Sequence, residues 1–364
     1  MAFRGVYPAS ELKPSVFGIL SVARVMSHTA RAYDERWIRG FAFEYDSEPT
    51  VRLLEETGSS VHTIFDSSGL AQYIDVKPFF IEVEDSRSTF GLTGEDRMAL
   101  VVKQLEAATQ KAVERELWNG YVVRDDGTTS QYLTEAGEYT LAAGSTAATA
   151  VSAWRAIAIL EGAMSNSPAG EQGVIHVPRD VAIQAVSDGP LIRVESADGR
   201  EHLETINGTP VIVGSGYTGD GPFSTVTNKA LTSNVATITT ATDHGLSAGD
   251  TVTVSGVDAT FNGTFTVASV PSTTTFTYTK TASNVSSTSA SGLAQMSGST
   301  TTKWIFATGC VDVHLGKPEV VNESLAQGFD VSGNQNDMLI KALRPAAVYF
   351  DPAIHYAVKV DLTA

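Results

Sequence analysis

A glycine-rich stretch that follows a predicted strand is the strongest candidate for cofactor chemistry in this 364-residue sequence. Gly214, Gly216 and Gly219 have the G-x-G-x-x-G spacing that lets backbone N–H groups approach a pyrophosphate in dinucleotide-binding folds. That chemistry also needs a helix that begins at the loop, because the helix N-terminus holds the phosphates. Here Asp220-Gly221-Pro222 follows, and a strand-rich segment comes next. The stretch is therefore interpreted as a connecting loop, and no cofactor is predicted.

Other residue types that carry catalysis are isolated in this sequence. It contains no G-x-S-x-G, no P-loop and no H-E-x-x-H pattern. His244 lies in an Asp-His-Gly turn and His355 lies close to Asp351, and both histidines are interpreted as structural. Cys310 is the only cysteine, which excludes an internal disulfide and a cysteine zinc site, and it is predicted to be a buried, inert thiol. We therefore predict no catalytic residue, no metal site and no enzyme activity.

The charge distribution limits the classes of partner. The formal net charge is −16. The first forty residues hold six Lys and Arg against three Asp and Glu, whereas residues 41–120 hold seven against fifteen. Tight wrapping of nucleic acid needs basic grooves, so an acidic chain argues against it. No signal peptide or membrane-spanning segment is evident, so synthesis in the cytoplasm is expected.

One long amphipathic helix is predicted to organise the chain. Its apolar positions recur at steps of three and four residues, as one helix face requires: Met98, Val101, Leu105, Ala108 and Ala112. The opposite face, which includes Glu114, is predicted to face solvent. Asn119-Gly120 is a helix stop. A helix from Gly94 to Trp118 would be roughly 37 Å long.

A ribbon of two strands is predicted directly before this helix. Its arms are 62–65 and 71–83, joined by turn residues 66–69, and Lys77-Pro78 interrupts the second arm. A two-stranded ribbon is marginally stable alone in water. Another copy of the chain would supply the missing surface, although a hairpin packed on its own domain is an equally good interpretation of the residues.

The remainder of the chain divides by composition. Residues 1–26 suggest an extended arm, and a short helix is predicted from Ser27 to Arg39. Helices that alternate with strands follow, and together they predict a compact α/β subdomain. These elements are a strand at 121–123, a helix from Ser145 or Thr146 to Met164, a strand at 173–177, a helix from Pro178 to Val186, and strands at 191–194 and 210–213.

A segment between Phe223 and Lys303 is poor in charge and rich in Thr, Ser, Val, Gly and Ala. Alternating patterns predict a small all-β module, a sandwich, Ig-like or an open barrel, with strands at 235–239, 251–254, 264–267 and 275–278. Its low-complexity end, 283–291, is predicted to be a return linker. Final strands are predicted at 338–343, 347–350 and 355–360.

The order of these parts, together with several short motifs, resembles the major capsid proteins of tailed bacteriophages with the Hong Kong 97 fold. Four short stretches are similar to capsid sequences of phages that infect actinobacteria. They are Gly173-Val-Ile-His-Val-Pro178, residues 203–214, Ala307-Thr-Gly-Cys-Val-Asp-Val313 and Arg344-Pro-Ala-Ala-Val-Tyr-Phe-Asp-Pro352. The resemblance covers nearly everything except about 224–302.

The resemblance implies an α+β fold with the domains of that family. They are an N-arm at 1–40, an E-loop region at 41–92, a P-domain with the spine helix at 93–140, an A-domain at 141–223 and 303–335, an inserted β domain at 224–302, and C-terminal strands that return to the P-domain at 336–364. The E-loop would lie over a neighbouring subunit.

The implied function is mechanical: hexamers and pentamers close an icosahedral head around phage double-stranded DNA, without sequence-specific binding and without a membrane. The expected location is the virion, after assembly in the host bacterial cytoplasm, with portal and decoration proteins as further partners. Subunit contacts are expected at Lys77, Phe79, Phe80, Glu82 and Arg87. A Lys–Asn crosslink, known in some relatives, would join Lys77 to Asn334 or Asn336.

Two alternatives and one departure accompany this resemblance. No room precedes the arm for the cleavable scaffolding segment of many relatives, so we expect a separate scaffolding protein or a segment already removed. An encapsulin-like nanocompartment would share the fold but enclose cargo protein. A phage or cell-surface adhesin would explain the β module alone, but not the long helix and ribbon.

Overall fold

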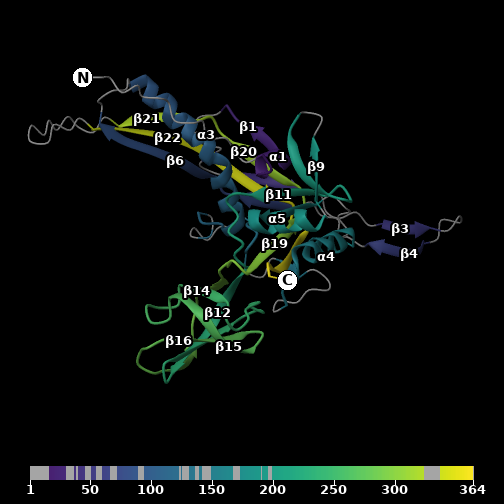
Figure 1. Cartoon of the computed structure of the whole chain (residues 1–364), viewed down its shortest axis with the longest axis vertical. Helices are drawn as coiled ribbons and strands as arrows, with labels where there is room; N and C mark the ends of the chain where they lie inside the picture. Colours follow the sequence, from purple (N-terminus) through teal and green to yellow (C-terminus); the bar gives the residue numbers. More distant parts are fainter. Residues whose placement is uncertain are drawn as a thin grey trace, which may run out of the picture.

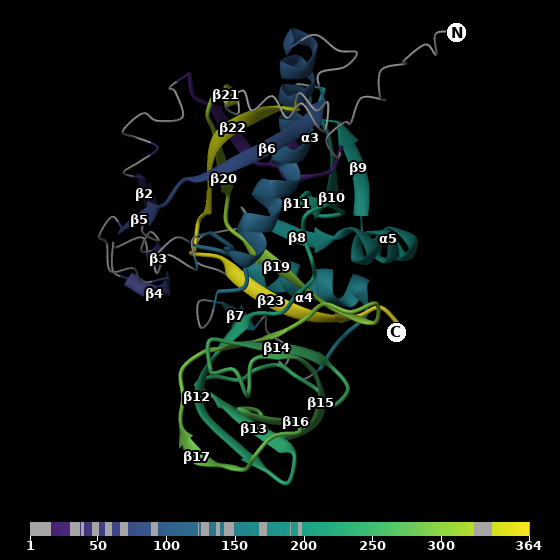
Figure 2. The same cartoon turned by 90° about the vertical axis from the view of Figure 1, so that its left-hand side faces the viewer.

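The computed structural model of the chain describes residues 16–29, 37, 40–45, 51–54, 60–65, 72–88, 94–122, 124, 131–135, 139–141, 149–166, 173–189, 191–195, 199–323 and 337–363. One long helix lies along a first sheet, a second sheet with two helices lies beside it, and a small barrel is attached below (Figure 1 and Figure 2). A narrow hairpin extends to one side of the body (Figure 1).

The long helix, α3 (Gly94–Asn119), packs along a five-stranded sheet, as the apolar period predicted. Val101, Leu105 and Leu117 are fully buried in the core that the helix shares with this sheet. The central strand carries one partner on one edge and two in succession on the other (Figure 2). The strands are β22 (Asp337–Phe350) at the centre, β6 (Phe79–Ser88) on one edge, β21 (Glu319–Glu323) and β20 (Val311–Leu315) on the other, and β1 (Arg24–Ser27) parallel to β20.

β22 replaces the two strands predicted at 338–343 and 347–350, because Pro345 does not interrupt it. Pro345 has no N–H to donate, but it lies opposite Phe80 of β6, and its carbonyl accepts a hydrogen bond from the Gly316 N–H at 2.8 Å. The result is one strand that runs the length of the sheet.

The hairpin is longer than predicted and has a different turn. β2 (Phe41–Tyr45) pairs with β5 (Gln72–Val76), and farther out β3 (Val51–Leu54) pairs with β4 (Ser60–Phe65). The predicted pairing of 62–65 with 71–83 is therefore wrong, and the chain reverses between β3 and β4 rather than at 66–69. Alternation fixes which face a side chain takes but not which strand is the partner. The predicted interruption at Lys77-Pro78 is present between β5 and β6.

A seven-stranded sheet forms the second half of the body, covered by α4 (Ala153–Ser165) and α5 (Arg179–Asp188). Ile157 and Leu160 of α4 and Val181 of α5 are buried in one core with this sheet. Gly189 ends α5 in the left-handed conformation, with φ of 97°. In spatial order the strands are β7 (Thr140–Leu141), β23 (His355–Asp361), β19 (Thr302–Thr308), β8 (Val174–Pro178), β11 (Pro210–Gly214), β10 (Glu201–Thr205) and β9 (Leu191–Glu195).

Three expectations about this half need correction. The final strand β23 pairs with β19 here, so it does not return to the sheet of α3 as predicted. Of the stretch 303–335, only β19 joins this sheet, whereas β20 and β21 join β22. α4 begins at Ala153 rather than at Ser145 or Thr146, because Val151 is extended and forms a bridge with Val360. β10 was not predicted.

Residues 223–296 form a barrel of their own between β11 and β19 (Figure 2). The predicted all-β module is present, and its pairing runs β12–β13–β16–β15–β14–β18 and returns to β12, so the barrel is closed rather than open. Ser233 and Asn234 have φ of 51° and 62° and make the tight turn between β12 and β13. The strands are β12 (Phe223–Thr232), β13 (Val235–Thr240), β14 (Thr251–Ser255), β15 (Gly263–Ser272), β16 (Thr275–Thr279), β17 (Val285–Ser289) and β18 (Leu293–Met296). β17 occupies the predicted linker 283–291 and pairs with β12.

Two local predictions near α3 also differ from the structure. α1 (Ile19–Val22) and β1 lie in the segment predicted as an extended arm, and Ser27, the predicted helix start, is the last residue of β1. Trp37 is helical and buried, and the other residues of the predicted helix from 30 onward lie outside the described residues. Tyr121 and Val122 form a turn rather than a strand.

Candidate assembly surface

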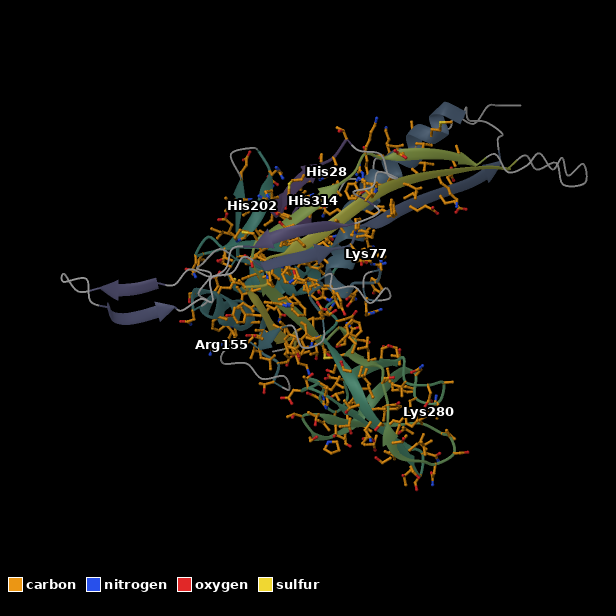
Figure 3. All side chains as sticks on the ribbon, turned by 180° about the vertical axis from the view of Figure 1, so that it is seen from behind. His28, Lys77, Arg155, His202, Lys280 and His314 are labelled. Atoms are coloured by element: carbon orange, nitrogen blue, oxygen red, sulfur yellow. The ribbon has the colours of Figure 1, made fainter. Side chains whose placement is uncertain are left out.

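The hairpin is the part of the described chain that most needs a partner. Neither of its strand pairs, β2–β5 and β3–β4, has a third strand among the residues that the structure describes. The hairpin points away from both sheets and from the barrel (Figure 1 and Figure 3). Unpaired strand edges are templates for pairing with another chain, and a lone hairpin is marginally stable in water.

Three of the predicted contact residues lie at the base of the hairpin and face different environments. Phe79 is only 5% exposed and packs in the chain's own core, so little of its side chain is available to a neighbouring subunit. Phe80, the next residue on β6, is 44% exposed. Lys77 is half-buried at the joint between β5 and β6. Phe80 and Lys77 stay predictions.

The other predicted residues follow along β6 or lie outside the described part. Glu82 is exposed, and its Oε1 lies 3.6 Å from Lys341 Nζ on β22, so it pairs within the chain. Arg87 lies opposite Met338, and its side chain is not among those described. Asn334 and Asn336 lie outside the described residues, so the crosslink stays a prediction.

Glu114 joins three segments of the chain near the C-terminal end of α3. Its side chain is fully buried, which corrects the prediction that it faces solvent. One carboxylate oxygen accepts from the Ile19 N–H at 3.1 Å and from Gln110 Nε2 at 3.0 Å. The other accepts from the Gly216 N–H at 2.7 Å and from the Ser215 hydroxyl at 3.1 Å. Burial raises the pKa of Glu114, while these four hydrogen bonds lower it. The carboxyl group thus fixes α1 and the 215–216 loop to the spine helix.

The glycine-rich loop is a structural connection, as predicted. A Cβ atom added to Gly216 would lie 2.5 Å from the Lys111 carbonyl oxygen, so the loop passes directly against the backbone of α3. β12 begins at Phe223, and no helix starts at the loop. The close approach that suggested a nucleotide therefore serves packing on the helix instead.

Buried polar contacts hold the barrel to the body in a fixed position. Lys359 on β23 is only 2% exposed, and its Nζ lies 2.8 Å from Asp250 Oδ2 and 3.0 Å from the Gly245 carbonyl oxygen. Asn119, at the end of α3, donates to Asp220 and accepts from Gln295 on β18 at 3.0 Å. Charged and amide groups placed in this way make the junction specific in orientation.

The histidines of the second sheet have structural partners. His176 is fully buried, with Nδ1 2.8 Å from Tyr217 Oη and Nε2 2.8 Å from Thr308 Oγ1. Burial, with a smaller effect of His355, lowers the pKa of His176 to about 3. His355 Nε2 lies 3.1 Å from the Leu133 carbonyl oxygen. Asp351 accepts a hydrogen bond from the Ala353 N–H at 2.9 Å, a contact within its own turn.

The other candidate reactive side chains, Cys310 and His244, also have structural surroundings. Cys310 is exposed, so the prediction of a buried thiol is wrong, but partial desolvation and the nearby carboxylates of Asp351 and Asp312 raise the pKa of its thiol. His244 Nδ1 accepts from the Leu246 N–H at 3.0 Å in its turn. Within the described ranges, no group of three His, Cys, Asp or Glu side chains is placed to hold a metal ion. No helix in the same ranges is long and apolar enough to span a membrane.

An open groove of about 710 Å³ lies between α4 and the turn that joins β10 to β11. Trp154 and Ile206 form its exposed apolar walls, and Gly162 lies on its floor. Its polar side is the Glu161 carboxylate, which accepts hydrogen bonds from Thr205 and Asn207. Because that carboxylate already has partners, the groove offers apolar surface rather than reactive groups.

Comparison with known proteins gives matches among solved structures alone. No family model matches the sequence, and no curated protein matches it. The capsid of a native GTA particle is 12% identical, with 98% of this chain and 92% of that chain covered and a TM-score of 0.43. A structure of Microbacterium phage Oxtober96 is 9% identical, with 99% and 95% covered and a TM-score of 0.43. The holo-SrpI encapsulin complex from Synechococcus elongatus PCC 7942 is 9% identical, with 100% and 94% covered and a TM-score of 0.42.

The chain is similar to capsid and encapsulin structures. The phage and GTA matches correspond to the predicted family, and the encapsulin match corresponds to the first alternative.

Two important groups were not found from the sequence. Glu114 lies among charged residues, and its helical period alone placed it on the solvated face. Lys359 is a single lysine in the last strand, with Asp250 more than a hundred residues earlier. One signal was present in the sequence, because Lys359 lies among the apolar residues of the strand from Ala357 to Val360. A lysine in such a strand is buried only when it has a charged partner, so the pattern indicates a buried ion pair.

Proposed function

We propose that this chain is the major capsid protein of a tailed bacteriophage, which self-assembles into a closed shell around double-stranded DNA. The observation that carries the proposal is the hairpin of β2–β5 and β3–β4, which extends from the body with no third strand among the described residues. A sister copy supplies the covering surface, because an isolated hairpin is marginal in water. The ordered motifs of the sequence point to the same family.

The body of the molecule suits a load-bearing role. α3 has 26 residues, which corresponds to about 39 Å at 1.5 Å per residue, and β6 and β22 pair beside it over ten residues. Lys341 on β22 lies between Glu82 and Glu84 of β6 at 3.6 and 3.7 Å. Helix and strands together form one long, continuously paired unit.

The finer assignments follow from the family resemblance. Copies form hexamers and pentamers, with the second sheet around the capsomer axis and obligate contacts that bury more than about 2,000 Å². The barrel projects from the outer surface. A separate scaffolding protein, a portal and a decoration protein are partners, assembly occurs in the host bacterial cytoplasm, and the mature location is the virion.

Deleting the outer hairpin tests the proposal. A variant in which a short Gly-Ser turn replaces residues 46–71 keeps the β2–β5 pair and loses β3 and β4. We expect the purified variant to stay folded by circular dichroism but to form no shells in negative-stain micrographs. A variant that lacks 224–302 is the matched control and still forms shells, because the barrel is an appendage of the body. Closed shells from the hairpin variant would contradict the proposal.

The contents of native particles distinguish a capsid from an encapsulin shell. A capsid packages DNA, so particles treated with nuclease and then opened release double-stranded DNA. An encapsulin shell releases cargo protein and little nucleic acid. The ratio of absorbance at 260 and 280 nm for purified native particles separates these outcomes.

A further inference from the structure

A pair of histidines joins the N-terminal strand to the body. β1 is the outermost strand of its sheet and pairs only with β20 among the described strands, in parallel, from Arg24 opposite Asp312 to Ser27 opposite Leu315. Directly after β1, the His28 ring meets the His314 ring edge to edge, with centroids 5.0 Å apart and nearly parallel planes at 14° (Figure 3). His28 Nε2 lies 2.8 Å from His314 Nδ1.

This contact depends on the number of protons that the two rings carry. A hydrogen bond between two ring nitrogens needs one N–H donor and one bare acceptor nitrogen, so one of the two facing nitrogens carries no proton. If both rings are protonated, the hydrogen bond is lost and two positive charges lie about 5 Å apart. The pair is therefore stable only while at least one ring is neutral.

The surroundings of the pair add charge from each packed strand. Arg24 on β1 forms an ion pair with Asp312 on β20, and the Tyr349 hydroxyl on β22 donates to the same carboxylate. The Trp37 ring lies edge-on to His28, with centroids 5.6 Å apart. The Arg24 guanidinium disfavours further positive charge here, whereas Asp312 favours it.

We propose that His28 and His314 form an acid-sensitive clamp, which holds β1 on β20 near neutral pH and releases it when both rings become protonated. Release exposes the edge of β20. The proposal concerns the fold of one chain and is independent of shell formation.

The expected size of the effect follows from the charges. Two unit charges about 5 Å apart, at an effective dielectric constant of about 20, lower the docking equilibrium by about a hundredfold or more. Burial, and next the neighbouring His28, lower the pKa of His314 to about 4 from its ordinary 6.5. A depressed histidine pKa in the docked state means that the undocked state binds protons first. Docking is thus complete above pH 6.5 and is lost as the pH falls toward about 4.

Hydrogen–deuterium exchange of the full chain, followed by mass spectrometry between pH 7.5 and 4.5 and corrected for intrinsic exchange rates, tests the clamp. In the unaltered protein we expect the β1 amides to lose about a hundredfold of their protection at the acidic end. The double variant His28→Gln with His314→Asn keeps a donor and an acceptor at the two facing positions but has no titratable ring. In this variant we expect the protection of the β1 amides to change less than threefold over the same pH range. The Arg24–Asp312 pair is present in both proteins, so it does not account for a difference between them.

His202→Gln is the control, because it removes a histidine of the other sheet that pairs with Glu204, and its β1 strand should respond as in the unaltered protein. If the double variant does not fold, His28→Gln alone removes the second charge and has the same expected result. Equal acid sensitivity of β1 with and without the two rings would overturn the proposal. Unchanged protection of β1 at pH 4.5 in the unaltered protein would overturn it too.

Discussion

Replacing Glu114 by alanine is expected to be the most destabilising single change on the spine helix. The substitution removes the acceptor of four hydrogen bonds, two of which come from the buried backbone N–H groups of Ile19 and Gly216. Those two groups cannot turn toward other partners, whereas the Ser215 hydroxyl and the Gln110 amide can. A buried donor left without an acceptor costs about 1–3 kcal/mol, so the two together cost about 4 kcal/mol.

Thermal unfolding followed by tryptophan fluorescence measures this cost. Trp118 lies one turn beyond Glu114 and packs on Tyr217 and Phe306, with ring centroids 4.7 and 5.1 Å apart. A loss of about 4 kcal/mol corresponds to a decrease in Tm of at least about 8 °C for a large domain. Arg115→Ala, the adjacent exposed position on α3, is the control and should change Tm little. Equal Tm values for the two variants would refute the conclusion that Glu114 fixes α1 and the 215–216 loop to α3.

The other predictions concern the same body. Lys359→Met leaves the largely buried Asp250 without its cation and should lower the free energy of unfolding by about 3 kcal/mol. Met at the exposed Lys317 should be neutral, and similar denaturant midpoints for the two variants would argue against the Lys359–Asp250 ion pair. Gly216→Ala should lower Tm clearly, because its Cβ would meet the Lys111 carbonyl. Gly162→Ala in α4 has open space around its Cβ and should raise the free energy of unfolding by about 0.5–1 kcal/mol. The opposite order of Tm values in a thermal shift assay would contradict the packing described. His176, with its pKa lowered to about 3, is neutral in the folded protein and charged in the unfolded chain below pH 6.5. The folded state therefore loses about 1.4 kcal/mol per pH unit from 6.5 down to about 3. His176→Gln should remove that part of the slope in urea titrations at several pH values, and an unchanged slope would count against a neutral buried ring.

Local patterns predicted the elements of this chain well where one face is apolar and one is polar. α3 follows the three-and-four spacing from Met98 to Ala112, and the barrel strands β13, β14 and β16 follow strict alternation. In these elements, apart from the last two turns of α3, burial of a single face decides the structure, and that information is local.

Partner choice was not predictable in the same way. The residues of β4 show a strand, but only the folded chain shows that its partner is β3 rather than β5. β23 is an apolar strand in either sheet, and its pairing with β19 depends on long-range packing. After Val285, β17 contains only Ser and Thr and has little apolar pattern, so its strand exists because β12 offers an edge.

The candidate assembly surface was predicted in outline and corrected in detail. The sequence indicated a two-stranded ribbon and a joint at Lys77-Pro78, and both are present. Phe79 and Phe80 are neighbours of the same type, so no local pattern says which one turns inward; pairing with β22 decides it. The buried groups that fix the spine and the barrel, Glu114 and Lys359, are charged residues whose burial depends on partners far away in the sequence.

The mass of the purified full-length protein in solution tests the central claim most directly. Light scattering coupled to size-exclusion chromatography, under assembly conditions and with a candidate scaffolding protein present, should show capsomers and closed shells many times the mass of one chain. A single species at 38.5 kDa under every condition would contradict the account, because the hairpin would then be stable without a sister copy.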